Sequence, residues 1–254
     1  MPARDSGLDT GSLCAIVQAR MGSERLPGKT LLALADKPVL AHVIERLRVC
    51  KNLDCLAVAT SVTPADDAIV SLCNELSVQC VRGSENDVLE RFVEAGSAIG
   101  AETIVRVTGD NPLIDPAIVD ALADAMRRDP KLEYCFASNA PLGTSCEAVR
   151  LGVLRRVQAL CDRPDQREHV TLFIRENPQL FNVMEIRSSL GTPGLRLTLD
   201  TEEDFEMLSA VFAALYHPGE LLAVRDVIRY LQEHESVMRL NRDVRQRRPG
   251  NPVV

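Results

Sequence analysis

Short apolar runs of strand length alternate with segments of helical periodicity along most of this chain, with a repeat of about 20–25 residues. Such alternation indicates a mainly parallel sheet that is covered by helices on both sides. The chain is therefore predicted to be an α/β protein of three layers. The strands are expected at Leu13–Ala19, Leu56–Thr60, Gln79–Arg82 and Thr103–Thr108. The helices are expected at 38–49, 63–76, 87–100 and from Asp115 onward.

The alternation breaks between residues 134 and 190. This region is expected to contain strands and helices at Tyr134–Ser138, Glu147–Arg150, Leu151–Cys161, Gln166–Glu176 and Phe181–Ile186. The main pattern then resumes with a strand at Leu195–Thr198 and a helix capped by Thr201. We therefore predict one domain over residues 13–235 with 134–190 as an inserted subregion. Residues 1–12 are expected to be a flexible tail, and the Arg-rich residues 236–254 a solvated basic tail.

Composition limits the class of protein. The net charge of −7 argues against a nucleic-acid partner, because an acidic body repels the phosphate backbone. No apolar run reaches the roughly 18 residues that a membrane span needs, and residues 1–12 lack the apolar segment of a secretory signal. We therefore expect a cytoplasmic protein with no membrane partner. The eight cysteines include no C-x-x-C pair, so they are expected to be small apolar side chains rather than zinc ligands.

A basic, glycine-containing loop follows the first predicted strand, from Arg20 to Gly28, and leads into Lys29. Ligands of open α/β sheets bind at this carboxyl edge, where glycine lets backbone N–H groups approach an oxyanion. Arginine and lysine add positive charge, so the loop is predicted to bind a polyphosphate. Five residues separate Gly22 from Gly28, instead of the four of a Walker A loop, and the dinucleotide-binding glycine pattern is absent. The spacing therefore argues against a P-loop NTPase.

Two aspartates occupy comparable positions after predicted strands. Asp110 follows Thr103–Thr108, and Asp200 follows Leu195–Thr198, so both are expected at the same sheet edge. Magnesium prefers hard oxygen ligands, usually one or two carboxylates together with substrate phosphate. The pair is therefore predicted to hold Mg²⁺ opposite the basic loop. The alternative for Asp200 is to cap the helix that follows it.

A third polar cluster, residues 82–87, follows the third predicted strand. Ser84 and Asp87 are candidates for contacting the edge of a pyrimidine base. Equally, Ser84 would cap the next helix with Asp87 three residues later, as in a capping box. Both alternatives stay open at this point.

Residues 18–29 run Q-A-R-M-G-S-E-R-L-P-G-K, which resembles the opening signature of the sugar cytidylyltransferases. The chain is most similar to the SpsF-like branch of spore coat polysaccharide biosynthesis. That branch is related to acylneuraminate and 3-deoxy-manno-octulosonate cytidylyltransferases. Residues 109–112 and 200–204 also resemble the family's G-D-x-P and D-T-x-x-D motifs. The resemblance extends over residues 13–215, and it implies a fold of the nucleotide-diphospho-sugar transferase (GT-A-like) type.

The implied activity is Mg²⁺-dependent transfer of CMP from CTP to an acidic sugar or similar hydroxy-acid, with release of pyrophosphate. It would serve the synthesis of surface polysaccharide or glycan precursors. The resemblance implies that the triphosphate is contacted by Arg20, Arg25 and Lys29. It places the nucleotide near Gln18, Ala19, Gly22, Ser84 and Asp87. It assigns the metal to Asp110 and Asp200, while Asp204, at the third position of the capped helix, is expected to be structural.

The acceptor is expected to bind in the region 134–190. A sugar acid needs a cation, which Arg167 or His169 would supply, and Glu147 would bind the sugar hydroxyls. Asn139 is a further candidate for contacting the acceptor. Relatives commonly carry an acidic residue where this chain has Ser145, so the acceptor's identity stays open. The family resemblance also implies a homodimer that uses this region. Cys146 has no histidine partner in the sequence pattern and is expected to pack in the interior.

Two other functions are compatible with this fold. A glycosyltransferase that uses a nucleotide-sugar usually carries an Asp-x-Asp metal motif, but no two aspartates of this chain are two residues apart. A non-catalytic nucleotide-binding protein would not need both the basic loop and the two aspartates. Pyrophosphate release distinguishes the three functions.

Overall fold

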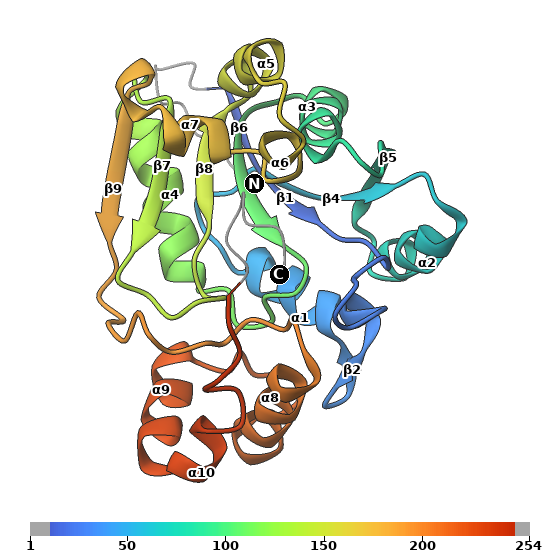
Figure 1. Cartoon of the computed structure of the whole chain (residues 1–254), viewed down its shortest axis with the longest axis vertical. Helices are drawn as coiled ribbons and strands as arrows, with labels where there is room; N and C mark the ends of the chain where they lie inside the picture. The colour runs from blue at the N-terminus through green and yellow to red at the C-terminus, as the bar shows by residue number, and fades with distance from the viewer. Residues whose placement is uncertain (1–10, 247–254) are drawn as a thin grey trace, which may run out of the picture.

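The computed structural model describes residues 11–246, and within them a seven-stranded sheet forms the centre of the molecule (Figure 1). The strand order across the sheet is β5-β4-β1-β6-β8-β7-β9. Strands β5, β4, β1 and β6 are parallel to one another, whereas β8 runs antiparallel between β6 and β7. The mainly parallel α/β fold is therefore confirmed. The strand bounds are β1 Ser12–Gln18, β4 Cys55–Ser61, β5 Gln79–Gly83, β6 Ala101–Thr108, β7 Tyr134–Ser138, β8 Glu147–Arg150 and β9 Val183–Arg187.

Helices cover both faces of the sheet because its central strands are apolar on both sides. In β1, Leu13, Ala15 and Val17 face one core, while Cys14 and Ile16 face the other. The first core is closed by α1 Val39–Arg48, α2 Asp67–Glu75 and α4 Pro116–Arg128. The second is closed by α3 Val88–Ala98 and α5 Leu151–Leu160. The predicted three layers are thus present.

Two predicted elements differ in the structure. The expected helix Gln166–Glu176 is two short helices, α6 Pro164–Glu168 and α7 Leu172–Glu176, followed by a 3₁₀ turn at Pro178–Leu180. Val170 interrupts them because its backbone is left-handed, with φ of 51°. The expected strand Leu195–Thr198 forms only a single bridge, between Arg196 and Leu142. Its apolar Leu197 instead belongs to a third core beyond the sheet edge.

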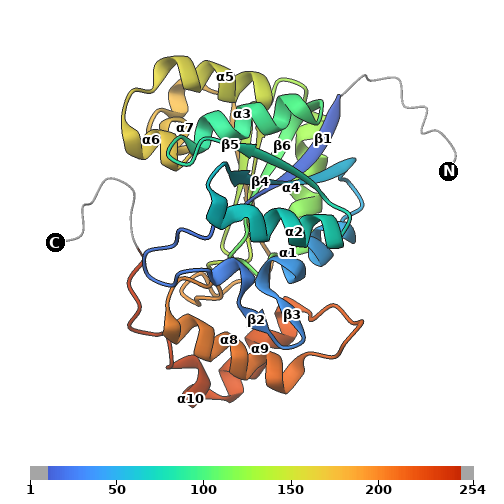
Figure 2. The ribbon, with the colours of Figure 1, turned by 90° about the vertical axis from the view of Figure 1, so that its right-hand side faces the viewer.

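That third core lies below the sheet in Figures 1 and 2, where α8, α9 and α10 form one group. Their bounds are α8 Glu202–Leu215, α9 Val224–Glu233 and α10 Glu235–Met238, and a small hairpin of β2 Ala33–Leu34 and β3 Lys37–Pro38 joins them. Most of residues 236–246 are exposed, as a solvated tail requires, but Val237 and Met238 pack against the third core, so the segment is not a free tail. Asn241 is buried there, and its amide donates to Asp204 and to the carbonyl of Arg196. Residues 247–254 and 1–10 lie outside the described residues.

Asp204 ties this helical group to the sheet edge, as its predicted structural role requires. It is fully buried, and its carboxylate accepts hydrogen bonds from Arg196 at 2.7 and 2.8 Å and from the backbone of Asp200 at 2.9 Å. It also completes a capping box with Thr201 at the start of α8. The side chain of Asp204 therefore both neutralises the buried guanidinium of Arg196 and caps the start of α8.

Replacing Asp204 by Asn is expected to lower the free energy of unfolding by about 3 kcal/mol, because it removes one partner of a buried ion pair. Urea denaturation measures the change. The exposed Glu206 of the same helix supplies the control, since Glu206→Gln is expected to shift stability by less than about 0.5 kcal/mol. Equal midpoints for both variants would contradict the structural role.

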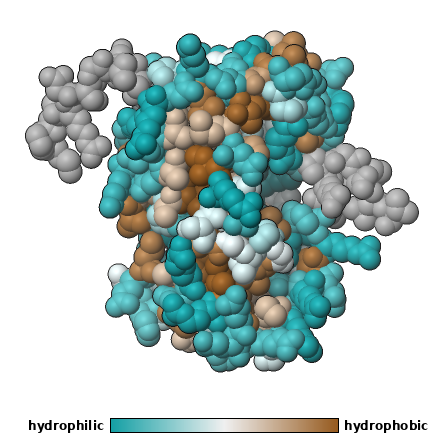
Figure 3. Space-filling view, turned by 90° about the vertical axis from the view of Figure 1, so that its left-hand side faces the viewer, coloured by the Kyte–Doolittle hydropathy of each residue, from teal (hydrophilic) through white to brown (hydrophobic). Residues whose placement is uncertain are grey.

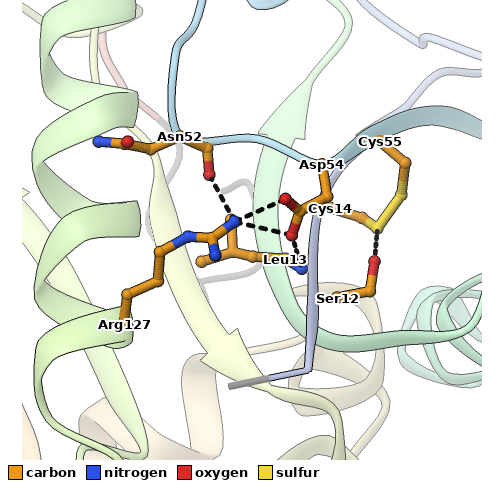
Figure 4. Close-up of a disulfide and its surroundings, with 7 residues drawn as sticks. All are labelled: Ser12, Leu13, Cys14, Asn52, Asp54, Cys55 and Arg127. Atoms are coloured by element: carbon orange, nitrogen blue, oxygen red, sulfur yellow. Dashed lines mark hydrogen bonds and ion pairs between the residues drawn. A yellow bond between two sulfur atoms is a disulfide. The ribbon is translucent and has the colours of Figure 1, made fainter. Parts of the chain in front are cut away.

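Cysteine behaves as predicted in one place and not in another. Cys146 packs in the first core, and burial raises the pKa of its thiol well above the usual value. Cys14 and Cys55, however, form a disulfide between the neighbouring strands β1 and β4, with Cα atoms 4.6 Å apart (Figure 4). The expectation that the cysteines are simple apolar side chains is therefore wrong for this pair. Sequence spacing did not reveal that the sheet register places these two residues directly opposite each other.

The strand β9 forms one edge of the sheet, and Figure 3 looks onto this side of the molecule. Apolar side chains appear there among polar ones; Met184 of β9 is 39% exposed and the nearby Leu180 55%. An open edge strand offers unpaired backbone groups to another chain. The predicted homodimer through residues 134–190 stays a prediction. Within residues 11–246 no helix is long and apolar enough to cross a membrane.

Candidate active site

A cleft of about 480 Å³ opens at the carboxyl edge of β1 and β6. This size suits a small-molecule substrate. Its lining comes from the loop after β1, the end of β6, the start of α3, the end of α6 and the segment before α8. These segments are far apart in the sequence, and the sheet brings them together. The structure therefore has a cleft at the sheet edge where the site was predicted.

Buried hydrogen bonds hold the loop after β1 in place. Asp66, which lies in a 3₁₀ turn at Pro64–Asp66, accepts from the backbone N–H of Met21 at 2.7 Å. Gly28 has a left-handed φ of 70° and donates its N–H to the carbonyl of Met21. Gly109, directly after β6, allows the start of the loop to lie close to β6, because a Cβ at Gly109 would be 3.1 Å from the carbonyl oxygen of Gln18. The loop after β1 is thus held in one conformation by hydrogen bonds and close packing.

Five charged side chains meet on one wall of the cleft. The ammonium of Lys29, at the start of a 3₁₀ turn Lys29–Leu31, lies 2.5 Å from Asp110 Oδ2 and 2.6 Å from Asp200 Oδ1. The other oxygen of Asp200 receives Arg25 at 3.1 Å and Arg196 at 2.9 Å. The basic loop and both predicted metal ligands are therefore brought together, with Lys29 between the two carboxylates.

The opposite charges of this cluster favour the ionised forms of one another. Burial alone would lower the pKa of Lys29, but Asp110 and Asp200 outweigh it and raise that pKa above its usual value. Burial would likewise raise the pKa of Asp200, but Lys29, Arg25 and Arg196 hold it below the usual range. The ammonium and the Asp200 carboxylate are therefore both ionised at neutral pH.

The two aspartates also fit a magnesium ion. One oxygen of each already converges on a single cationic atom, the Nζ of Lys29. Within residues 11–246 no group of three or more His, Cys, Asp or Glu side chains is arranged to hold a metal. Two carboxylates that leave further positions to phosphate oxygens are the usual pattern for magnesium at a nucleotide. The donor set is thus incomplete without a phosphate-bearing substrate.

Eight of the predicted site residues line the cleft. They come from β1, the loop after it, the ends of β6 and α6, and the segment before α8: Gln18, Ala19, Arg20, Arg25, Lys29, Asp110, His169 and Asp200.

A sequence profile of the family described as cytidylyltransferase matches residues 14–222. The chain belongs to the cytidylyltransferase family. It is thus an enzyme of this family, and the SpsF-like resemblance is confirmed by the spore coat polysaccharide biosynthesis protein SpsF of Bacillus subtilis. That protein is 40% identical over 206 residues, which cover 78% of this chain and 85% of SpsF. The 3-deoxy-manno-octulosonate cytidylyltransferase of Geobacter sulfurreducens is 33% identical over 154 residues, which cover 59% of this chain and 53% of that enzyme.

The fold is that of solved cytidylyltransferases. The structure of a cytidylyltransferase from Leptospira borgpetersenii serovar Hardjo-bovis superposes with a TM-score of 0.84 at 28% identity. The match covers 96% of this chain and 99% of that one, so it includes the α8–α10 group as well as the sheet. The predicted fold type is therefore confirmed.

Three predicted residues of this cytidylyltransferase are occupied in holding the start of α3. Asp87 is the N-cap of that helix, because it accepts from the N–H of Glu90 at 2.9 Å. Its second oxygen pairs with Arg167 of α6. Ser84 accepts from the N–H of Asp87 at 3.1 Å. The capping alternative is thus close to the observed geometry, with Asp87 rather than Ser84 as the cap. Arg167 pairs with that cap and does not line the cleft.

Glu147 lies behind the cleft wall rather than in its lining. Its carboxylate accepts from Arg106 at 3.0 Å, Tyr134 at 2.6 Å and Thr171 at 2.8 Å, so its oxygens are already bonded. Burial would raise the pKa of Glu147, but Arg106 and the two hydroxyl donors hold it below the usual value. The prediction that it binds sugar hydroxyls therefore fails on geometry. Its partner Arg106 faces the cleft in its place.

Two further predicted residues also lie outside the lining. Gly22 is exposed on the outer part of the loop. Asn139 follows β7 with a left-handed φ of 56°, and its amide donates to the carbonyl of Ser188 at 2.9 Å. Both positions shape local turns. Asparagine tolerates the left-handed backbone that such a turn requires.

The cleft also contains two arginines that the motifs did not identify. Arg91 projects from α3 and Arg106 from β6, and both line the cleft. A signal for each was present in the sequence. Arg91 lies on the apolar face of its helix with Val88 and Ala95, and Arg106 interrupts the otherwise apolar core of its strand. A charged residue at a position that the pattern assigns to the core is a candidate functional residue.

Proposed function

We propose that this enzyme transfers CMP from CTP to a sugar acid and releases pyrophosphate in a Mg²⁺-dependent reaction. The observation that carries the proposal is the cluster of Lys29, Arg25, Asp110 and Asp200 on one wall of the cleft. It combines cations for a polyphosphate with paired carboxylates for a metal. The family membership and the names of the relatives support cytidine and a sugar acid as the two substrates.

The reaction forms one bond and breaks one. The hydroxyl oxygen of the acceptor bonds to the α-phosphorus of CTP, the bond from that phosphorus to the β-phosphate oxygen breaks, and the hydroxyl proton leaves to solvent. Arg20, Arg25 and Lys29 bind the triphosphate and stabilise charge on the departing pyrophosphate. Gln18 and Ala19 hold the nucleoside at the end of β1. The protein's contribution is positioning and charge neutralisation rather than covalent catalysis.

Asp110 and Asp200 would hold the magnesium ion. When bound, Mg²⁺ neutralises phosphate charge and lowers the pKa of an oxygen that it ligates. Lys29 has to leave one or both carboxylates for the ion to bind them. Its flexible side chain starts at the basic loop, so the same ammonium then remains available to the phosphates.

A pyrophosphate-release assay tests the function. The purified chain is incubated with Mg²⁺, CTP and a panel of sugar acids that includes 3-deoxy-manno-octulosonate and N-acetylneuraminate. Release that requires both substrates, and that falls when ATP, GTP or UTP replaces CTP, is the expected result. Transfer of sugar from a nucleotide-sugar would identify a glycosyltransferase instead. CTP binding without release with any acceptor in the panel would favour a non-catalytic protein.

We also infer the cellular setting from the relatives. SpsF is named for polysaccharide biosynthesis, which supports a role in supplying an activated sugar acid for a surface polysaccharide. A cytoplasmic homodimer remains the expected state. Light scattering would measure a mass twice that of the 27.9 kDa chain.

A further inference from the structure

Arg91 is a cation buried in the wall of the cleft. The residue is only 1% exposed, yet its side chain belongs to the cleft lining. One of its nitrogens donates to the carbonyl of Ser84 at 3.0 Å, whereas its Nε has no hydrogen-bond partner. Among residues 11–246 no carboxylate forms an ion pair with it. Burial and then Arg20 lower its pKa, and the more distant carboxylates of Asp66, Glu85 and Asp87 offset this only in part. A buried charge that has no carboxylate in direct contact is costly for folding, so a bound anion would stabilise it.

The segment after β5 is built around this guanidinium. A Cβ at Gly83 would lie 2.7 Å from Oε2 of Glu94 and 3.2 Å from Cγ of Arg91, so glycine makes room for both side chains. The turn that presents the Ser84 carbonyl is held by the Ser84 hydroxyl, which accepts from Asp87. Asp87 in turn caps α3, the helix that carries Arg91. The family-like segment 82–87 therefore positions Arg91.

A second arginine stands on the same wall. Arg106 donates to Glu147 at 3.0 Å and lies over the ring of Phe92, 5.9 Å from its centroid. Tyr134 and Thr171 hold Glu147 in place. Nε of Arg106 is also buried without a partner. Like Arg91, this side chain is thus fixed by the protein without all of its donors being used.

We propose that Arg91 and Arg106 form an anion subsite that binds the acid group of the acceptor, an assignment that rests on the proposed transfer to a sugar acid. Both guanidinium groups come from the wall formed by α3 and β6. His169, at the end of α6, lines the cleft in the region predicted for the acceptor. Glu147 and Ser84 are positioning residues, since they act through the two arginines.

Location favours the acceptor over the nucleotide as the source of this anion. Arg25 and Lys29 already lie on the wall that carries both aspartates, next to α8, where the triphosphate and its metal are expected. The helices α3 and α6 lie at the upper part of the molecule and α8 at the lower part in both views (Figures 1 and 2). Arg25 and Lys29 therefore serve one anion, and Arg91 and Arg106 a second one.

Pyruvate, a carboxylate with no acceptor hydroxyl, is the probe. Its binding to the full chain is followed by ligand-observed NMR and by the shift in melting temperature, with and without saturating CTP and Mg²⁺. Pyruvamide is the neutral comparison. The variants are Arg91→Met, Arg106→Met and, as a control at an exposed position of α5, Arg155→Met. The affinity for CTP is measured for every variant.

The expected result is binding of pyruvate but not pyruvamide to the wild type, weakened at least about tenfold in Arg91→Met and Arg106→Met and unchanged in Arg155→Met. Arg91→Met is expected to melt at or above the wild-type temperature, since an unpaired buried charge has been removed. No binding of pyruvate to the wild type overturns the subsite. So does equal binding by all variants, or a loss of CTP affinity in place of carboxylate affinity. Failure of the wild type to bind CTP would instead reject the proposed function, while the nucleotide-free titration still decides the subsite.

Discussion

Replacing Asp110 by Asn is expected to lower the rate of pyrophosphate release about a thousandfold, with little change in folding. The amide keeps the size of the side chain but removes the charge that the metal and Lys29 both require. Metal-assisted charge stabilisation contributes several kcal/mol to such reactions, and each 1.36 kcal/mol corresponds to a tenfold change in rate. Steady-state kinetics with CTP, Mg²⁺ and the active sugar acid measures the loss.

Asp124→Asn is the matched control. Asp124 lies in α4 and does not line the cleft, and its one ion pair within residues 11–246 is with the exposed Arg128. This variant is expected to retain the wild-type rate. Circular dichroism and melting temperature establish that Asp110→Asn is folded. A folded Asp110→Asn protein with a wild-type rate would reject the metal assignment.

Replacing Lys29 by Met is expected to have two opposite effects. The rate of pyrophosphate release falls about a hundredfold, because a cation that stabilises the leaving group is lost. The affinity of the nucleotide-free protein for Mn²⁺ rises at least about tenfold, because the ammonium no longer competes for Asp110 and Asp200. The first effect concerns the phosphates and the second concerns the metal, so one substitution tests both roles of Lys29.

Electron paramagnetic resonance of free Mn²⁺ measures the affinity directly and does not depend on turnover. Lys51→Met supplies the control, since Lys51 lies on the surface away from the cleft and is expected to change neither quantity. A Lys29→Met protein with weaker Mn²⁺ binding would mean that Lys29 helps to order the aspartates instead of standing in for the ion. In that case the competition between ammonium and metal is rejected.

Local patterns in the sequence were sufficient for most of the framework. The two-residue and 3.6-residue periodicities predicted the main strands and helices, because a buried face of a strand or helix requires apolar residues at regular spacing. The caps at Asp115 and Thr201 were recognisable for the same local reason, and both accept the expected backbone N–H. The loop after β1 and Asp110 were predicted at one site, because the ends of parallel strands meet at one edge. Asp200 was predicted there by the same argument, but Leu195–Thr198 is not a strand of the sheet; the N–H of Leu199 donates to the carbonyl of Asp110 instead and brings Asp200 to this edge.

The errors have a common cause. The Cys14–Cys55 pair depends on the register between two strands, and the break at Val170 depends on one backbone angle. The docking of 236–246 depends on a buried contact between Asn241 and Asp204, 37 residues apart. Each of these features is either a contact between distant segments or a single backbone torsion. Such features produce no periodic pattern of apolar residues in the sequence.

The sequence by itself determined the α/β alternation, the position of the polyphosphate loop and the family, since these rest on local burial patterns and on short motifs. Only the tertiary structure decided which charged groups meet. It placed Lys29 between Asp110 and Asp200. It also placed Glu147 against Arg106 and the carbonyl of Ser84 against Arg91, on another wall of the cleft. The physical reason is that electrostatic partners are chosen by distance in space, which the sheet and its packed helices set.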